Sequence, residues 1–127
     1  MSEREMLEMA ARAAGMMDGG RPLSTSLDGT LWAGTGMAVR PWRPHDDDGQ
    51  AFRLAVALRI DVQHDQQEEC VFAGEYAGQC FEDWNGAPLA ATRLAIVKAA
   101  AAIGEKTRDD TALRNLNAAS EAMGEEL

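Results

Sequence analysis

Apolar and polar residues alternate more regularly over residues 51–63 than anywhere else in the chain. A period of two residues is typical of a β-strand, whereas on a helix the same side chains would spread around the whole circumference. The alternation therefore predicts a long strand that buries its bulky face fully and its alanine-rich face partly. The bulky positions of this stretch are Phe52, Leu54, Val56, Leu58, Ile60 and Val62.

Two further strands are predicted beside this one. Residues 37–42 (MAVRPW) form one, with Pro41 at a sheet edge or a strand end, and residues 70–81 contain the other. The runs 45–50 and 64–69 are rich in turn-forming and charged residues, so we expect loops there. Because these links are too short for crossover connections, the pattern predicts an antiparallel meander of about three strands.

The first helix is predicted within residues 1–20. Ser2 and Glu5 fit a Ser-x-x-Glu capping box, and Gly19–Gly20 is the expected end. Its Met-rich face indicates packing against the core or against a partner rather than chemistry. The residues of this face are Met6, Met9, Ala10, Ala13 and Met17.

Two more helices are predicted after a turn at Asn85–Gly86. One begins with Pro88 in its first turn and ends at Gly104. The other spans residues 109–123 and is capped by Asp109 or Asp110.

These elements predict an α+β fold: a small antiparallel sheet of about three strands, covered by helices on both faces in an α-β-α sandwich. The 127 residues fit one domain. We divide it into an N-terminal helix (1–20), a sandwich core (22–103) and a C-terminal helix (109–123).

The hydroxyl-rich run at residues 24–26 comes directly before Leu27 and Leu31. Ser24 or Thr25 is expected to cap a short helix, with Asp28 in its first turn. A serine nucleophile would need a base close by, and no histidine lies near it in the sequence. We therefore interpret these hydroxyl groups as a helix cap.

The formal net charge of −9 argues against binding to a nucleic-acid backbone, which needs clustered Lys and Arg. Excess acid favours solubility, and it also permits a basic protein partner or mimicry of a nucleic acid. No signal peptide or membrane span is recognisable, so we expect no membrane association. Two cysteines without a disulfide framework predict free thiols in the cytoplasm, which would be the host cytoplasm if a phage encodes the chain.

Two segments are similar to the phage ABA sandwich domain family of small phage and prophage proteins. Residues 24–32 (STSLDGTLW) resemble its Ser-Thr-Asp helix start, with the acid later than in the family, and residues 87–100 (APLAATRLAIVKAA) resemble its late helix. The resemblance spans about residues 22–103. It implies helices on both faces of an antiparallel sheet, and it implies no activity because the family has no catalytic residues to carry over.

Several side chains are candidate reactive groups. His45 and His64, each next to acidic residues, would make a metal site or a small enzyme if their loops met, but solvated loops are the favoured interpretation. Cys70 and Cys80 lie beside acidic residues that disfavour a thiolate, so structural thiols are favoured. Glu75 is the remaining candidate acid, and it would equally point to solvent or pair with an arginine.

The run RPWRP at residues 40–44 is the one basic, aromatic and proline-stiffened patch in this acidic chain. Trp is frequent among interface anchors, although a Trp packed on a sheet edge under its own arginines fits equally well. We therefore predict a non-catalytic phage or prophage accessory protein, without a cofactor, that binds a host protein, a phage protein or a second copy of itself. The predicted contact residues are Arg40, Trp42, Arg43, Met6 and Met9. The alternatives are a small metal-dependent or other enzyme that uses His45 and His64, and an acidic nucleic-acid mimic.

Overall fold

A computed structural model describes the backbone of residues 2–15, 24–33, 40–74 and 80–125, and the side chains of these residues except 24–25, 33 and 107–125. The strands form two antiparallel sheets, ordered β1–β2–β3 and β4–β5–β6. In chain order the elements are α1 (Glu3–Ala13), β1 (Ser24–Thr25), β2 (Leu31–Ala33), β3 (Arg40–Pro41), α2 (Asp48–Leu58), β4 (Asp61–Asp65), β5 (Cys70–Gly74), β6 (Cys80–Asp83) and α3 (Pro88–Glu125).

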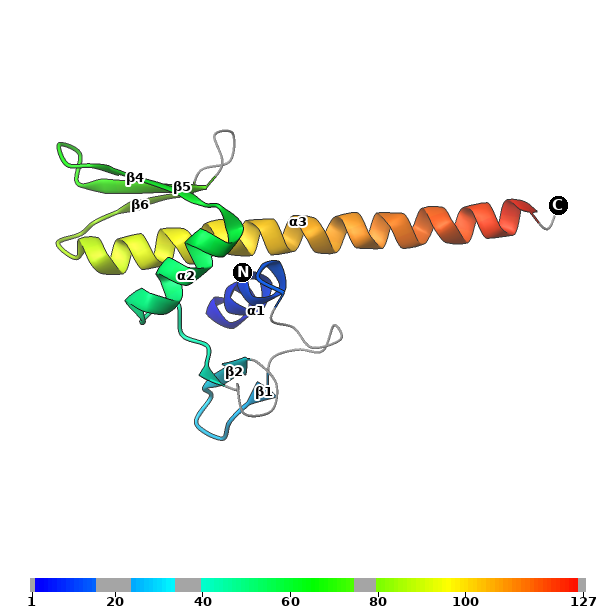
Figure 1. The fold of residues 1–127 in the computed structure, drawn as a ribbon, viewed down its shortest axis with the longest axis horizontal. Helices are drawn as coiled ribbons and strands as arrows, with labels where there is room; N and C mark the ends of the chain where they lie inside the picture. The colour runs from blue at the N-terminus through cyan, green and yellow to red at the C-terminus, as the bar shows by residue number, and fades with distance from the viewer. Residues whose placement is uncertain (1, 16–23, 34–39, 75–79, 126–127) are drawn as a thin grey trace.

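The other elements are assembled on the long helix α3 (Figure 1). Its N-terminal half contacts α1, α2, β5 and β6. The β4–β5–β6 sheet lies along one side of α3, and α1 and the small β1–β2–β3 sheet lie on the other side. The C-terminal part of α3 extends beyond all of these elements. The single helix therefore fixes the relative positions of the sheet, α1 and α2.

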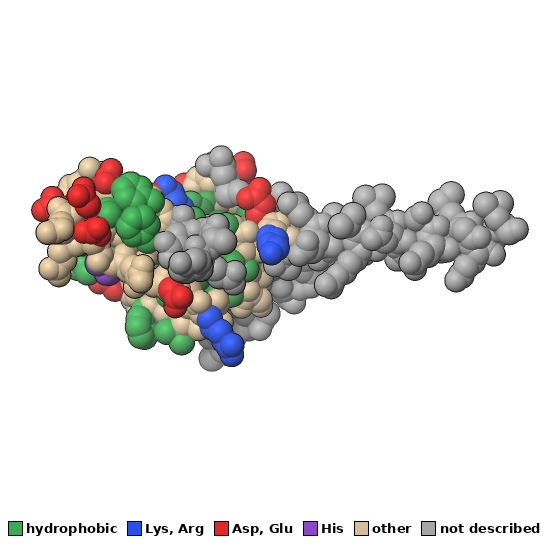
Figure 2. Space-filling model, turned by 90° about the horizontal axis from the view of Figure 1, so that it is seen from above, with side chains coloured by type: hydrophobic (Ala, Val, Ile, Leu, Met, Phe, Trp, Pro, Cys, Tyr) green, Lys and Arg blue, Asp and Glu red, His purple; other side chains and the backbone are tan. Residues whose placement is uncertain are grey.

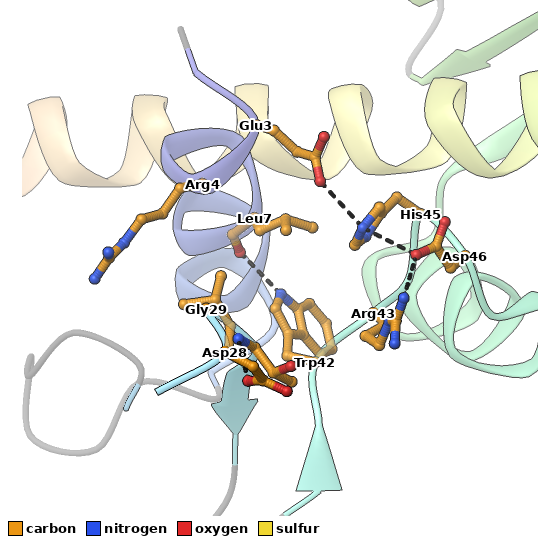
Figure 3. Close-up of a pocket in the computed structure, with 11 residues that line it drawn as sticks. Glu3, Arg4, Leu7, Asp28, Gly29, Trp42, Arg43, His45 and Asp46 are labelled. Atoms are coloured by element: carbon orange, nitrogen blue, oxygen red, sulfur yellow. Dashed lines mark hydrogen bonds and ion pairs between the residues drawn. The ribbon is translucent and has the colours of Figure 1, made fainter. Parts of the chain in front are cut away.

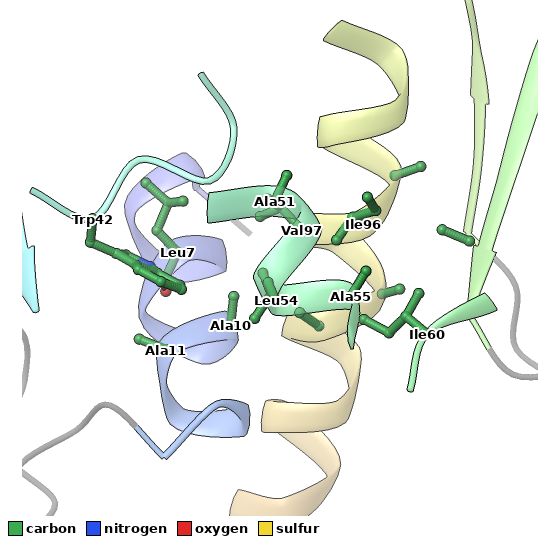
Figure 4. Packing of buried hydrophobic residues seen from close by; sticks show 14 of the residues in the cluster. Leu7, Ala10, Ala11, Trp42, Ala51, Leu54, Ala55, Ile60, Ile96 and Val97 are labelled. Atoms are coloured by element: carbon green, nitrogen blue, oxygen red, sulfur yellow. Dashed lines mark hydrogen bonds between the residues drawn. The ribbon is translucent and has the colours of Figure 1, made fainter. Parts of the chain in front are cut away.

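Buried apolar residues from α1, α2, β5 and α3 form one cluster between these elements (Figure 4). Alanine is the commonest residue in the part of the cluster that α3 supplies, which consists of Ala91, Ala95, Ile96, Val97, Ala99 and Ala100. Because alanine side chains are short, the neighbouring elements approach the α3 backbone closely.

The closest approach is at Gly104, where α1 crosses α3. A Cβ atom built on Gly104 would overlap the carbonyl oxygen of Met9 and lie 2.8 Å from its carbonyl carbon. Only hydrogen fits between the two backbones at this point, so Gly104 is required by packing. The cap of α1 at Ser2 is confirmed, since Ser2 Oγ accepts a hydrogen bond from Glu5 N at 3.2 Å.

The predicted ends of the helices are wrong in two places. We expected Gly104 to end one helix and Asp109 or Asp110 to begin another, but α3 continues as one helix of 38 residues. Glycine inside a helix lowers its stability without ending it, and here the contact with α1 compensates. The helix α1 ends at Ala13, with Gly15 at a φ of 71°, so it ends before Gly19–Gly20, which lie outside the described residues.

The strand predicted over residues 51–63 is also wrong for most of its length. Residues 48–58 form the helix α2, and only Asp61–Asp65 is extended. Asp47 caps α2, because its Oδ1 accepts a hydrogen bond from Gln50 N at 2.8 Å. The chain then turns through Arg59, whose φ of 54° is left-handed, and continues as β4.

The buried face of α2 explains why residues 48–58 form a helix although their apolar and polar residues alternate as in a strand. Ala51, Leu54 and Ala55 are buried, and their spacing of three and four residues is helical. Phe52 and Val56, which we assigned to the buried face of a strand, are instead exposed. Because two of the three buried residues are alanines, the helical face was hidden among larger apolar side chains.

The α+β class and the small antiparallel meander are confirmed, with strands that differ from those predicted. Residues 70–81, predicted to contain one strand, hold β5 and the first two residues of β6, and these two strands pair with each other. Val71 and Ala73 on β5 are fully buried on the face of the sheet that α3 covers. Helical cover was expected on both faces, but among the described residues it lies on this one face (Figure 1).

Residues 24–33 form a hairpin, so the helix predicted there is wrong. The strands β1 and β2 pair antiparallel, and Gly29 occupies the turn with a φ of 87°. Asp28 Oδ1 accepts a hydrogen bond from Ser26 Oγ and another from Thr30 N at 3.0 Å. The hydroxyl and carboxyl groups therefore stabilise a turn, because the same residue types serve turns and helix caps.

Replacing Gly104 with Ala should destabilise the protein. At an unconstrained helical position this change stabilises by about 1 kcal/mol. Here the new Cβ overlaps the Met9 carbonyl group, so we expect the free energy of unfolding to fall by about 2 kcal/mol or more. Chemical denaturation measures it, and the exposed Ala102→Gly gives the helix-propensity contribution alone. An increase in stability for Gly104→Ala would contradict the close crossing.

The hydrogen bond from Ser26, together with that from Thr30 N, lowers the pKa of Asp28 from 3.8 to about 2. The ionised carboxylate therefore stabilises the hairpin above pH 3.8, and this contribution should be lost as the pH falls towards 2. In an NMR titration of the side-chain carboxyl carbon, Ser26→Ala should move the midpoint part of the way back to 3.8. An ordinary midpoint in the unsubstituted chain would contradict this turn geometry.

Candidate functional site

Trp42 joins the segment after β3 to α1. Its side chain is only 5% exposed, and Nε1 donates a hydrogen bond to the Leu7 carbonyl oxygen at 2.9 Å (Figure 3). Its backbone N–H donates to the Leu31 carbonyl oxygen at 2.7 Å, which continues the pairing with β2. The ring thus lies between α1 and the small sheet, in the core cluster (Figure 4).

The prediction that Trp42 is an exposed interface anchor is therefore wrong. A residue with this burial and this hydrogen bond cannot reach a partner without opening the core. Met9 is also buried, at 7% exposure, whereas Met6 is partly buried beside the core. Arg40 and Arg43 are exposed, so their role as contact residues stays a prediction.

Arg40 and Arg43 line a shallow groove of about 490 Å³ together with Arg53 from α2. Gln50 joins α2 to residues 41–43: its Oε1 accepts a hydrogen bond from Arg43 N at 2.7 Å, and its Nε2 donates one to the Pro41 carbonyl oxygen at 2.7 Å. The groove thus brings three arginines from two segments together. Sequence reasoning missed Arg53 and Gln50 because it placed Arg53 on a strand and Gln50 in a loop.

Acidic residues on the rim of this groove partly balance the arginines. Arg43 Nη2 donates to Asp46 Oδ2 at 2.8 Å, and this hydrogen bond is the main reason why the pKa of Asp46 is lowered. The described residues include no ion-pair partner for Arg40 or Arg53. The arginines therefore outnumber the charges that neutralise them, which suits a carboxylate from a partner.

The outer face of α2 continues this surface. Phe52 and Val56 are one helical turn apart, and they are 68% and 62% exposed. Arg53 lies beside them on the helix, and Arg59 follows at its end. Two large apolar side chains, flanked by arginines, are thus presented to solvent on a rigid element.

A second groove, of about 430 Å³, lies between the start of α1, the hairpin turn and residues 42–46 (Figure 3). His45 Nε2 lies 3.2 Å from Glu3 Oε1 and 3.3 Å from Asp46 Oδ2. The backbone oxygen of His45 accepts from Arg93 Nε at 2.9 Å. These contacts tie α1 and α3 to the segment before α2.

His64 lies elsewhere, on β4. Its Nε2 is 2.8 Å from Thr92 Oγ1 on α3, and its ring meets the edge of Trp84 at a centroid distance of 6.1 Å. His45 and His64 therefore have separate partners, and both make contacts where solvated loops were expected. In the part of the chain that the structure describes, no group of three His, Cys, Asp or Glu side chains is arranged to hold a metal.

The two cysteines are free and lie on neighbouring strands, where Cys70 is opposite Asp83 and Cys80 is opposite Ala73. Burial raises the pKa of both thiols, and nearby carboxylates raise that of Cys70 further. A raised pKa disfavours the thiolate that a nucleophile requires. Glu75 lies outside the described residues.

Comparisons of the chain with protein-family models, curated proteins and solved structures found no match. Similarity to the phage ABA sandwich family therefore stays a prediction. Residues 87–90 do open a helix, as that resemblance implies, but residues 24–32 form a hairpin where it implies a helix start. None of the helices described is long and apolar enough to cross a bilayer.

Substitution of Trp42 should destabilise the fold. Trp42→Phe removes the donor to Leu7 and should cost about 1–2 kcal/mol, and Trp42→Ala, which also leaves a cavity, about 3–5 kcal/mol. Thermal and urea unfolding measure both variants. Trp32→Phe, at a half-buried position of β2, is the matched control and should cost less. A stable Trp42→Ala protein would contradict the structural role.

Proposed function

We propose that this protein is a non-catalytic binding protein that recognises another protein through the outer face of α2 and the adjoining arginine-lined groove. The supporting observation is the exposure of Phe52 and Val56 on one face of α2. Large apolar side chains gathered on a rigid surface are typical of interaction sites, and arginine is enriched there.

The charges around this surface indicate the kind of partner. The chain carries a net charge of −9, yet Arg40, Arg43 and Arg53 line one groove beside Phe52. An apolar segment flanked by Asp or Glu would bury its apolar residues against α2 and place its carboxylates in the groove.

A phage or prophage origin and a host protein as the partner remain part of the proposal, and the support for them is the resemblance at residues 87–90. Mimicry of a nucleic acid and an activity that uses His45 or His64 remain alternatives. Neither has a specific observation in its favour among the described residues.

The double substitution Phe52→Ser and Val56→Ser should abolish partner capture while the protein remains folded. Both side chains are solvent-exposed, so circular dichroism should be unchanged, whereas recovery of the partner should fall at least about tenfold. Quantitative mass spectrometry after affinity purification from source cells measures recovery.

The control is Leu27→Ser, which removes an exposed apolar side chain from the hairpin turn. It should leave recovery unchanged. If the α2 double variant recovers the same proteins in the same amounts as the unsubstituted chain, the proposed surface is wrong.

A further inference from the structure

The outer face of the β4–β5–β6 sheet is a second exposed apolar surface. Phe72 and Phe81 are directly opposite in the register, and their ring centroids are 5.4 Å apart. Phe81 is 49% exposed. Since Val71 and Ala73 face α3, strand alternation places the two phenylalanines on the opposite face. No described helix covers that face (Figure 1).

Aspartates surround these two rings. On β4, Asp61 is opposite Gly74 and Asp65 is opposite Cys70, and on β6 Asp83 is opposite Cys70. Cys70, Phe72 and Gly74 alternate along β5 on one face, so the three aspartates lie on the face of Phe72. The pKa of Cys70 is raised partly by Asp65 and Asp83, in agreement with this placement. Figure 2, which looks onto this side, shows apolar side chains among acidic ones at the end of the molecule that carries the β4–β5 turn.

No arginine or lysine offsets these charges on the sheet itself. The three strands contain neither residue, and the lysine that reaches the sheet, Lys98 from α3, pairs with Glu82 on the covered face. The outer sheet face is therefore apolar with an acidic rim. The outer face of α2, with Phe52 and Val56 beside Arg53 and Arg59, is apolar with a mainly basic rim, and Asp48, one turn before Phe52, is paired with Arg93.

We propose that a second copy of this chain docks here, with the outer face of its α2 against the outer sheet face of the first copy. This inference builds on the proposed function and names its partner. Phe52 and Val56 of one copy pack on Phe72 and Phe81 of the other, and the two arginines meet the three aspartates. Because the two rims carry opposite charges, this pairing is favoured over contact between two identical faces, where like charges would repel each other.

The contact joins different faces of the two copies, so each copy keeps one face of each kind. Such a heterologous contact extends into chains or closes into a ring, unless a two-fold axis pairs both faces at once. A variant that lacks one face is therefore still able to join a variant that lacks the other face.

Complementation between two variants tests the proposal. Arg53→Glu with Arg59→Glu reverses the α2 rim, and Asp61→Lys with Asp83→Lys reverses the sheet rim. Sedimentation equilibrium should show self-association of the unsubstituted chain, at least about tenfold weaker for either variant alone. An equimolar mixture of the two variants should form heterodimers or longer mixed complexes, because the two unaltered faces pair and the two reversed rims are also opposite in sign. A chain with all four substitutions should regain self-association, because its rims are again opposite in sign.

Lys106→Glu, an exposed reversal on α3 away from both faces, is the matched control and should associate like the unsubstituted chain. A monomeric unsubstituted chain at about 1 mM overturns the proposal, as does a variant mixture without heterodimers. If the chain is monomeric and the α2 double serine variant still loses a foreign partner, self-pairing fails and the proposed function stands. If the chain self-associates as expected and no foreign partner depends on α2, the function reduces to self-assembly.

Discussion

The close crossing of α1 and α3 is the contact on which the other parts of the structure depend. Gly104 allows the backbone of α1 at Met9 to approach α3 to a distance that no side chain would permit. With α1 held there, the Leu7 carbonyl group is in position to accept the hydrogen bond from Trp42. Trp42 in turn positions β3 beside β2 and the arginine-bearing segment beside α2. One glycine on α3 thus determines where residues far apart in the sequence meet.

The same helix explains which surfaces remain exposed. Its alanine-rich stripe leaves room for α2 on one side and for β5 on another, so both elements lie close against α3. Arg93 fixes the start of α2 by bonding to the His45 carbonyl oxygen and to Asp48. Three sizeable apolar side chains, Phe52 and Val56 on α2 and Phe81 on β6, are left on the outer faces. These uncovered apolar side chains are the reason for expecting a partner.

Local signals in the sequence predicted the cap at Ser2, the turn at Asn85–Gly86 and the start of α3 at Pro88, because each depends on the chemistry of a few neighbouring residues. The alternation at 51–63 misled because large side chains dominate a hydrophobic pattern, whereas two of the three residues on the buried face of α2 are alanines. The Asp47–Gln50 cap was the available signal for a helix there. The role of Trp42 depends on a bond between residues 35 positions apart, which no local pattern reveals.

The order of the elements along the chain has a consequence for biosynthesis. Helices α1 and α2 and the strands β5 and β6 leave the ribosome before α3, yet α3 supplies the contacts that bury them. The nascent chain therefore exposes its future core until the N-terminal part of α3 has been made. A chain truncated before Pro88 would keep two small sheets and two short helices without the element that joins them.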